Sequence, residues 1–244
     1  MMKLTLKEKF AFRFIFNERR VYQRWYGRFL VFGIDYGRLR RVVARVDNWL
    51  NWCREWRRDG AELEQKAHSA LEKGYSASAV ALFHEAVACY HIGQHIFFID
   101  PEQKESAQEK ARECYRQAIS LYRPEDRPVR IEIPFDGAVI PGYLHCAEAP
   151  VRPLAIYVNG MDNIKEAENH FFGRRMVEAG FNFFAFDGPG QGEMWRSMKF
   201  ILDYHRAVPA IIDWFEQHDD HGLGTVNLSR NDRERTRDVG VRTS

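Results

Sequence analysis

The feature that most constrains this chain is a change of hydrophobic period near residue 126. Up to about residue 122, apolar side chains recur at the i, i+3, i+4, i+7 spacing of one helix face, as in Leu39, Val42, Val43 and Val46. Residues 129–135 instead alternate apolar and polar side chains, which is typical of a strand. A charged segment with two prolines, residues 123–128, separates the two patterns. The sequence therefore predicts a helical domain over residues 1–126.

Residues 127–230 predict an α/β sheet. Asp136-Gly137 supplies a hairpin turn between strands at 129–135 and 138–146. Pro141 places the second of these strands at an edge or a bulge, because proline cannot donate to a ladder. Short apolar runs at 154–158 and 181–186 are typical of strands that a parallel sheet buries on both faces.

Helices are expected between and after these apolar runs. Asn163, with Glu166 three residues later, is typical of a helix start, and Gly180 follows the expected end. Another helix is expected around residues 204–217. Alternation of strand and helix favours the α/β class.

Two loops follow the apolar strands, at the edge of the sheet where α/β proteins bind ligands. The first, residues 159–163, reads Asn-Gly-Met-Asp-Asn and leads into a helix N-terminus, whose free N–H groups could bind a developing oxyanion. The second contains Asp187, Gly188, Gly190, Gln191, Gly192 and Glu193. Its glycines permit a tight backbone, and a plain strand-to-helix turn is the alternative interpretation.

Two phosphate-binding motifs are excluded for the second loop. G-x-x-x-x-G-K-[ST] is absent, and no lysine stands where the phosphates would need one. Gly188, Gly190 and Gly192 give G-x-G-x-G after a late strand, instead of the G-x-G-x-x-G of a dinucleotide site after a first strand.

The runs IEIPFDGAVIPGYLH, LAIYVNGMDNIKE and FNFFAFDGPGQGE together resemble the first strands of the α/β-hydrolase superfamily. They are most similar to the branch that includes 2,6-dihydropseudooxynicotine hydrolase and the fungal polyketide-shortening pigment hydrolases. The resemblance implies that the helical domain caps the active site. It also implies that N–H groups near Gly160 and Met161 help to form an oxyanion hole, and that Asp187 to Glu193 line the substrate pocket.

The chain departs from that family after residue 230. The nucleophile of the family lies in G-x-S-x-G on a strand-turn-helix elbow, with the acid and histidine later, and this sequence contains no such motif. Residues 231–244 form a charged tail without aromatic side chains. We therefore expect a truncated or frame-shifted chain that lacks the catalytic triad, and a genuinely divergent C-terminus is the alternative. Ser229, Ser244 and the histidines before them do not occupy the triad positions.

The helical domain contributes Tyr90 and His91 as candidate pocket residues, from position alone. His84, His91 and His95 lie near one helix face, and the i, i+4 pair could bind a metal. Core or pocket-wall histidines are the more common outcome. We expect no metal and no cofactor.

Charge and cysteine content favour a cytoplasmic protein. Residues 1–60 are strongly basic although the net charge is only +2, but no nucleic-acid motif accompanies them, so we expect a solvated face and no nucleic-acid partner. The four cysteines lie far apart, which argues against a disulfide framework. No apolar run is long enough for a membrane span, and charged residues interrupt the N-terminus, which argues against export. A homo-oligomer is possible.

Two functions remain open. The first is an α/β-hydrolase family protein that acts on an ester, amide or activated C–C bond of a small molecule by a Ser-His-Asp type mechanism, inactive in this truncated form. The second is a non-catalytic helical binding or interaction module. The DNA downstream of codon 230 would separate them.

Overall fold

The computed structural model describes residues 25–148 and 153–218. The chain divides into two compact units. The helical unit contains Met1–Arg127 and Asp162–Phe172, and the sheet unit contains Pro128–Met161 and Gly173–Ser244. The division falls inside helix α8 (Lys165–Glu178), so the loop before α8 and its first turns group with the helical unit.

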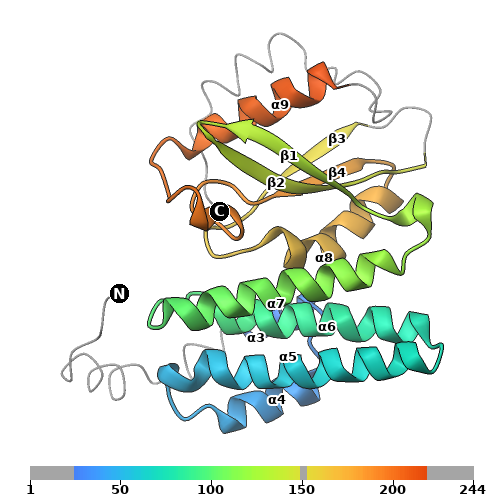
Figure 1. The fold of residues 1–244 in the computed structure, drawn as a ribbon, viewed down its shortest axis with the longest axis vertical. Helices are drawn as coiled ribbons and strands as arrows, with labels where there is room; N and C mark the ends of the chain where they lie inside the picture. Colours follow the sequence, from blue (N-terminus) through green and yellow to red (C-terminus); the bar gives the residue numbers. More distant parts are fainter. Residues whose placement is uncertain (1–24, 149–152, 219–244) are drawn as a thin grey trace. The chain divides into compact units, whose positions relative to one another are not determined.

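The helical unit follows the expected apolar pattern. Its described helices include α3 (Tyr26–Val31), α4 (Tyr36–Arg45), α5 (Trp49–Glu72), α6 (Ser76–Gln94) and α7 (Pro101–Ser120), followed by the short η1 (Pro124–Asp126). The three long helices, α5, α6 and α7, pack side by side (Figure 1). The start of α7 is capped, because Asp100 accepts the backbone N–H of Gln103 at 3.0 Å and Pro101 needs no N–H partner in the first turn.

Aromatic side chains fill the core of this unit. Trp52 and Trp56 repeat along one face of α5, their ring centroids lie 5.7 Å apart, and both are buried. Phe29 of α3 packs against both rings. Because each buried aromatic ring removes a large apolar area from water, this cluster supplies much of the stability of the unit.

A buried ion-pair network joins α4, α5 and α6. Arg38 contacts Asp59 at 2.6 Å and Glu85 at 2.7 Å, and Arg45 contacts both Glu55 and Asp59. Arg38 and Asp59 are less than a tenth exposed. The charges are therefore compensated inside the unit rather than displayed on its surface.

The sheet unit contains a mixed four-stranded sheet in the order β1-β2-β4-β3. Its strands are β1 (Val129–Phe135), β2 (Ala138–His145), β3 (Leu154–Val158) and β4 (Asn182–Phe186). β1, β2 and β4 pair antiparallel in that order, and β3 pairs parallel with β4. Asp136 and Gly137 both have positive φ, which confirms the predicted hairpin turn.

The expectation that Pro141 marks an edge strand or a bulge is wrong. β2 lies between β1 and β4, and Pro141 stands opposite Glu132 in an unbroken register. The carbonyl of Pro141 accepts the N–H of Asp187 at 3.0 Å, just beyond the end of β4. Since the N–H and C=O of a residue in an antiparallel strand point to the same side, the missing donor of Pro141 faces the place where β4 has already ended.

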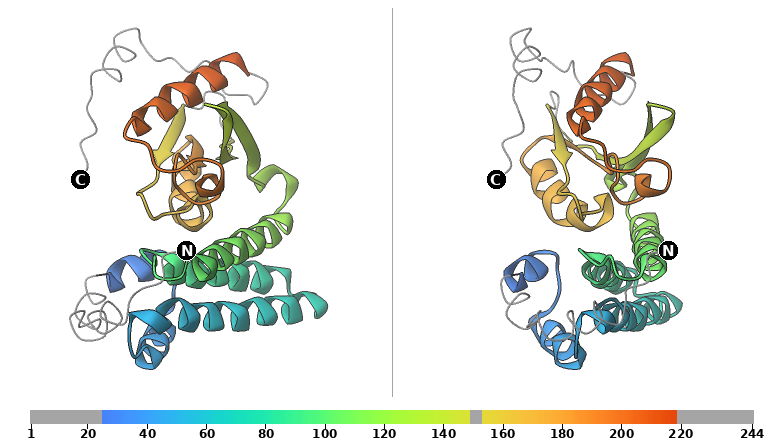
Figure 2. Two further views of the ribbon diagram at one scale, coloured as in Figure 1. Left: turned by 60° about the vertical axis from the view of Figure 1, so that its left-hand side comes forward. Right: turned by 90° about the vertical axis from the view of Figure 1, so that its left-hand side faces the viewer.

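Helices cover both faces of the sheet. On one face, Phe184 and Phe186 belong to a core shared with Ile211 and Phe215 of α9 (Ala207–Gln217), which crosses the strands in Figure 2. On the other face, Phe183 lies against Gly173 of α8. Successive side chains of β4 point to opposite faces of the sheet, and helices cover both faces. Every residue of this strand is therefore buried, as predicted.

β3 is less buried than the sequence predicts. Its residues are half-buried and Val158 is 46% exposed. The reason is that β3 is the terminal strand of the described sheet and pairs only with β4. Among the described helices of both units, none combines the length and apolarity that crossing a bilayer requires.

Candidate functional site

The two predicted loops leave neighbouring parallel strands at the same edge of the sheet. Val158, the last residue of β3, is in register with Phe186, the last residue of β4. The segment 159–161 and the segment 187–193 therefore begin side by side. Asn159 fixes their junction, because its side chain is buried and donates from Nδ2 to the carbonyl of Phe186 at 2.9 Å.

Gln191 joins the two loops. Its Nε2 donates to the carbonyl oxygens of Asn159 at 3.1 Å and Gly160 at 2.9 Å. The side chain is 2% exposed, so these bonds are made away from bulk water. The structure thus places Gln191 under the first loop, as a tie between backbone segments more than 30 residues apart.

The other end of the Gln191 amide is equally fixed. Its Oε1 accepts the backbone N–H of Gly188 at 3.0 Å and the hydroxyl of Tyr204 at 2.6 Å. Burial, with the charge of Asp187 nearby, raises the pKa of Tyr204, so the phenol stays protonated and donates. A Cβ at position 188 would lie 2.3 Å from the Tyr204 oxygen, which explains the glycine there.

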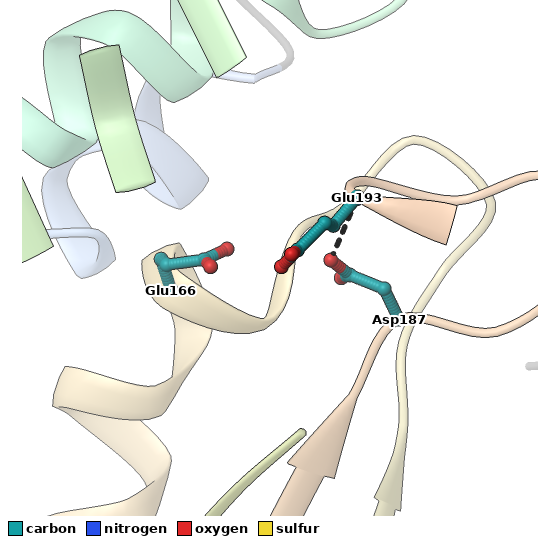
Figure 3. Close-up of side chains that lie close together, drawn as sticks. All are labelled: Glu166, Asp187 and Glu193. Carbon is teal, nitrogen blue, oxygen red and sulfur yellow. Dashed lines mark hydrogen bonds between the residues drawn. The ribbon is translucent and has the colours of Figure 1, made fainter. Parts of the chain in front are cut away.

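Asp187 and Glu193 close the second loop. A carboxylate oxygen of the fully buried Asp187 accepts the backbone N–H of Glu193 at 2.9 Å (Figure 3). Gly192 has a positive φ, and a Cβ there would lie 2.2 Å from the Asp187 carboxylate. The Glu193 carboxylate also accepts from the guanidinium of Arg130 at 2.8 Å. Gly190, also at positive φ, donates its N–H to Met198.

Gly160 and Met161 are the exposed part of the first loop. Met161 is 60% exposed, and Gly160 is also exposed. Across residues 25–148 and 153–218, neither backbone N–H donates to a backbone carbonyl. The described site therefore combines rigid, buried polar side chains below the loop with accessible backbone donors above it.

Tyr90 and His91 lie in α6 of the helical unit. Tyr90 is buried and its hydroxyl donates to Glu64 at 2.8 Å, while His91 is fully buried and its Nδ1 lies 3.1 Å from the amide nitrogen of Gln94. Burial, with the neighbouring His95, lowers the pKa of His91 well below its usual range. A pocket role for Tyr90 and His91 stays a prediction.

The remaining histidines and serines of the sequence analysis have other surroundings. His84 Nε2 lies 2.6 Å from the hydroxyl of Tyr122. His218 stacks on Trp214 with ring centroids 4.2 Å apart. His221, Ser229, Ser244 and the charged tail at 231–244 lie outside the described residues.

Sequence reasoning did not single out Asn159 or Tyr204 as site residues. Asn159 is the first residue after an apolar strand, and a polar side chain at that place is a signal that could have been used. Tyr204 gives no such signal. Its hydroxyl reaches Gln191 because the chain folds back between η2 (Met194–Arg196) and η3 (Tyr204–Arg206).

Comparisons with known proteins agree with this architecture. A family model described as Esterase FrsA-like matches residues 42–207. The 2,6-dihydropseudooxynicotine hydrolase of Paenarthrobacter nicotinovorans is 29% identical over 189 residues, which cover 77% of this chain and 50% of that protein. The alpha/beta hydrolase xenA of Xenoacremonium sinensis is 24% identical over 194 residues, covering 75% of this chain and 45% of that protein.

A solved structure extends the agreement to the fold. The crystal structure of the 2,6-dihydroxy-pseudo-oxynicotine hydrolase matches with a TM-score of 0.66 and 27% identity, over 78% of this chain and 53% of that chain. This match confirms the predicted fold class, a helical N-terminal part followed by part of an α/β-hydrolase sheet. The chain spans about half the length of the curated relatives it matches.

Proposed function

Because the chain belongs to the Esterase FrsA-like family, we propose that it supplies the oxyanion-binding part of a hydrolase site. The observation that carries this proposal is the Gln191 tie, which holds the exposed Gly160 and Met161 on a rigid base at the carboxyl ends of β3 and β4. The substrate class is a small molecule with an ester, amide or activated C–C bond next to a carbonyl.

The reaction needs an attacking serine and a donor pair for the carbonyl oxygen. As the serine adds to the carbonyl carbon, the oxygen gains negative charge, and fixed N–H groups stabilise that charge more in the transition state than in the substrate. We assign this role to the N–H groups of Gly160 and Met161. We assign the adjoining pocket wall to the segment from Asp187 to Glu193.

The nucleophile, acid and histidine are not assigned to any residue of the 244. The sequence carries no G-x-S-x-G, so we propose that these residues alone do not hydrolyse substrate. A triad encoded beyond codon 230 would complete the site.

The buried cysteines support a proposal for the compartment. Cys53, Cys89 and Cys114 are buried thiols, and burial raises the pKa of the Cys53 thiol to about 12, so it is an inert core residue. We propose a reducing, cytoplasmic setting for this chain.

The test has two parts. The 244-residue chain is treated with a fluorophosphonate probe and with p-nitrophenyl esters, and the DNA after codon 230 is read in all frames. We expect no labelling, no ester cleavage, and a downstream frame with G-x-S-x-G followed by Asp and His. The polypeptide extended through that frame should cleave esters.

Either of two results contradicts the proposal. Labelling that is lost when one serine of the present chain is changed would place a nucleophile within it. A downstream region without a G-x-S-x-G frame would favour the second candidate, a non-catalytic binding module, for which the absence of that motif from the chain is the supporting observation.

A further inference from the structure

We propose that Gln191, held by Tyr204, is a positioning residue that turns the N–H groups of Gly160 and Met161 to the same side as a paired donor for an oxyanion. This inference rests on the proposed function, since it says how the chain builds the hole that the function needs. It concerns only residues of the sheet unit.

The peptide planes at residues 159–161 fix the directions of the two N–H groups. In a trans peptide the C=O and the following N–H point in opposite directions, and every described peptide bond is trans. The carbonyl of Asn159 shares its plane with the N–H of Gly160, and the carbonyl of Gly160 shares its plane with the N–H of Met161. Both carbonyls point at Nε2 of Gln191, at 3.1 and 2.9 Å, so both N–H groups face away from it.

In an extended chain, two successive carbonyl oxygens do not usually accept hydrogen bonds from the same nitrogen atom. In a strand, successive carbonyls point to opposite sides, so successive N–H groups diverge. Capturing both carbonyls breaks that alternation at the end of β3. The result is two adjacent donors aimed together, which is the arrangement that binds an anion.

At position 191, glutamine can make these hydrogen bonds, whereas glutamate or alanine cannot. The primary amide has two hydrogens and an oxygen with two acceptor sites, and all four are used here: two donated to carbonyls, two accepted from Gly188 and Tyr204. Glutamate at this position would bring a carboxylate against two carbonyl oxygens. Alanine would leave both carbonyls free to rotate toward water.

Tyr204 fixes the orientation of the amide. Its hydroxyl can only donate to the Gln191 oxygen when that oxygen, and not the nitrogen, points toward η3. Phe200 stacks on the Tyr204 ring with centroids 6.1 Å apart, which holds the phenol in place. The second loop thus sets the direction of the donors in the first.

The experiment measures N–H directions in the 244-residue chain. Residual dipolar couplings of ¹⁵N-labelled protein report the orientation of the Gly160 and Met161 N–H vectors relative to the amides of β4. In the wild type, both couplings should fit vectors that point away from Gln191. In Gln191→Ala, both should change while those of Phe183 and Phe184 stay the same.

Matched variants separate positioning from stability. Gln217→Ala, on the exposed end of α9, should leave all these couplings unchanged. Tyr204→Phe keeps the ring and removes one hydrogen bond, so it should shift the two couplings less than Gln191→Ala. It also serves as the test if Gln191→Ala does not fold. Unchanged couplings of Gly160 and Met161 in every folded variant overturn the proposal.

A second measurement tests the anion. Methylphosphonate, a tetrahedral oxyanion, should shift the amide proton resonances of Gly160 and Met161 in the wild type, with roughly tenfold weaker binding in Gln191→Ala, as expected for loss of aligned hydrogen bonds. Equal binding by wild type and variant, or no shift in the wild type, overturns the proposal. Failure of the proposed function would show instead as a missing downstream nucleophile, with these results unaffected.

Discussion

The helical unit and the sheet unit place their buried polar groups differently. In the helical unit, charged side chains from three helices neutralise one another, as Arg38 does with Asp59 and Glu85. In the sheet unit, uncharged side chains such as Asn159 and Gln191 bind backbone carbonyls of loops. The ion pairs of the helical unit join its helices to one another. The hydrogen bonds of the sheet unit instead fix the orientation of a backbone segment.

Substitutions in the helical unit should therefore affect stability, and substitutions in the sheet-unit loops should affect local geometry. Loss of a partner in the helical unit leaves an uncompensated buried charge, with a cost to the whole unit. Loss of a tie in the sheet unit frees an exposed loop. The predictions that follow test this contrast.

The largest effect is expected for Arg38→Ala. It leaves the buried carboxylate of Asp59 with one partner fewer, which should cost about 3–5 kcal/mol of unfolding free energy. Urea unfolding followed by circular dichroism measures it. Lys66→Ala, which removes an exposed pair with Glu62, is the control and should cost less than about 0.5 kcal/mol. Equal losses of unfolding free energy in the two variants would show that the buried network does not stabilise the helical unit.

Gly142→Ala should have the next largest effect, in the sheet unit. A Cβ at position 142 would lie 2.1 Å from the Phe184 ring, which is buried between the sheet and α9. The overpacking should cost about 1–3 kcal/mol. In Gly27→Ala of α3, where nothing lies within 4 Å, thermal unfolding should show no loss of stability. A tolerated Gly142→Ala would mean that the sheet can separate from α9 at little cost.

The pH dependence of stability should come from the helical unit. Burial, with the positive charges of Arg28 and Lys104, lowers the pKa of His95 to about 4, and burial lowers that of His91 in the same direction. Since the unfolded chain titrates near 6.5, it binds more protons below that pH, so stability falls as the pH decreases from 6.5 toward 4. His95 alone should account for about 2 kcal/mol at pH 5.

Urea unfolding at pH 8 and pH 5 measures this loss. His95→Gln should reduce the difference between the two pH values, whatever its effect at pH 8. The same difference in wild type and variant would assign the acid sensitivity to other groups, including those of the sheet unit.

The smallest effect is expected for Glu193→Gln. The pair between Glu193 and Arg130 is about one-third exposed, so its loss should cost less than about 1 kcal/mol and should matter less at high salt. The backbone N–H of residue 193 still donates to Asp187. A loss above about 2 kcal/mol in thermal unfolding would show that charge, and not only backbone ties, holds the second loop.

Most elements could be predicted from the sequence because their signals are local. The strands Val129–Phe135 and Leu154–Val158 occupy the predicted residues, since alternation and apolar runs directly reflect burial. The end of α6 (Ser76–Gln94) has a weaker signal, because apolar side chains continue in the sequence past His95, where the chain leaves helical dihedral angles.

The features that were missed depend on distant partners. Pro141 is compatible with a central strand only because β4 ends opposite it, and the end of β4 is not visible from residue 141. Arg38 finds Glu85 across 47 residues, and Gln191 finds carbonyls more than 30 residues earlier. The sequence identified the glycine-rich loop as a site, but the tie made by Gln191 required coordinates.

The strand order also sets a sequence of events during synthesis. β4 lies between β2 and β3, although it is made after both. On a ribosome that adds about 5–20 residues per second, the β1–β2 hairpin is complete roughly 2–8 s before Phe186 emerges. During that interval one edge of β2, and β3 once it has been made, lack the strand that pairs with them in the folded sheet. The sheet is therefore completed only when β4 pairs with β2 and β3. A chaperone that binds the hairpin until β4 has been made would prevent its unpaired edge from associating with other chains.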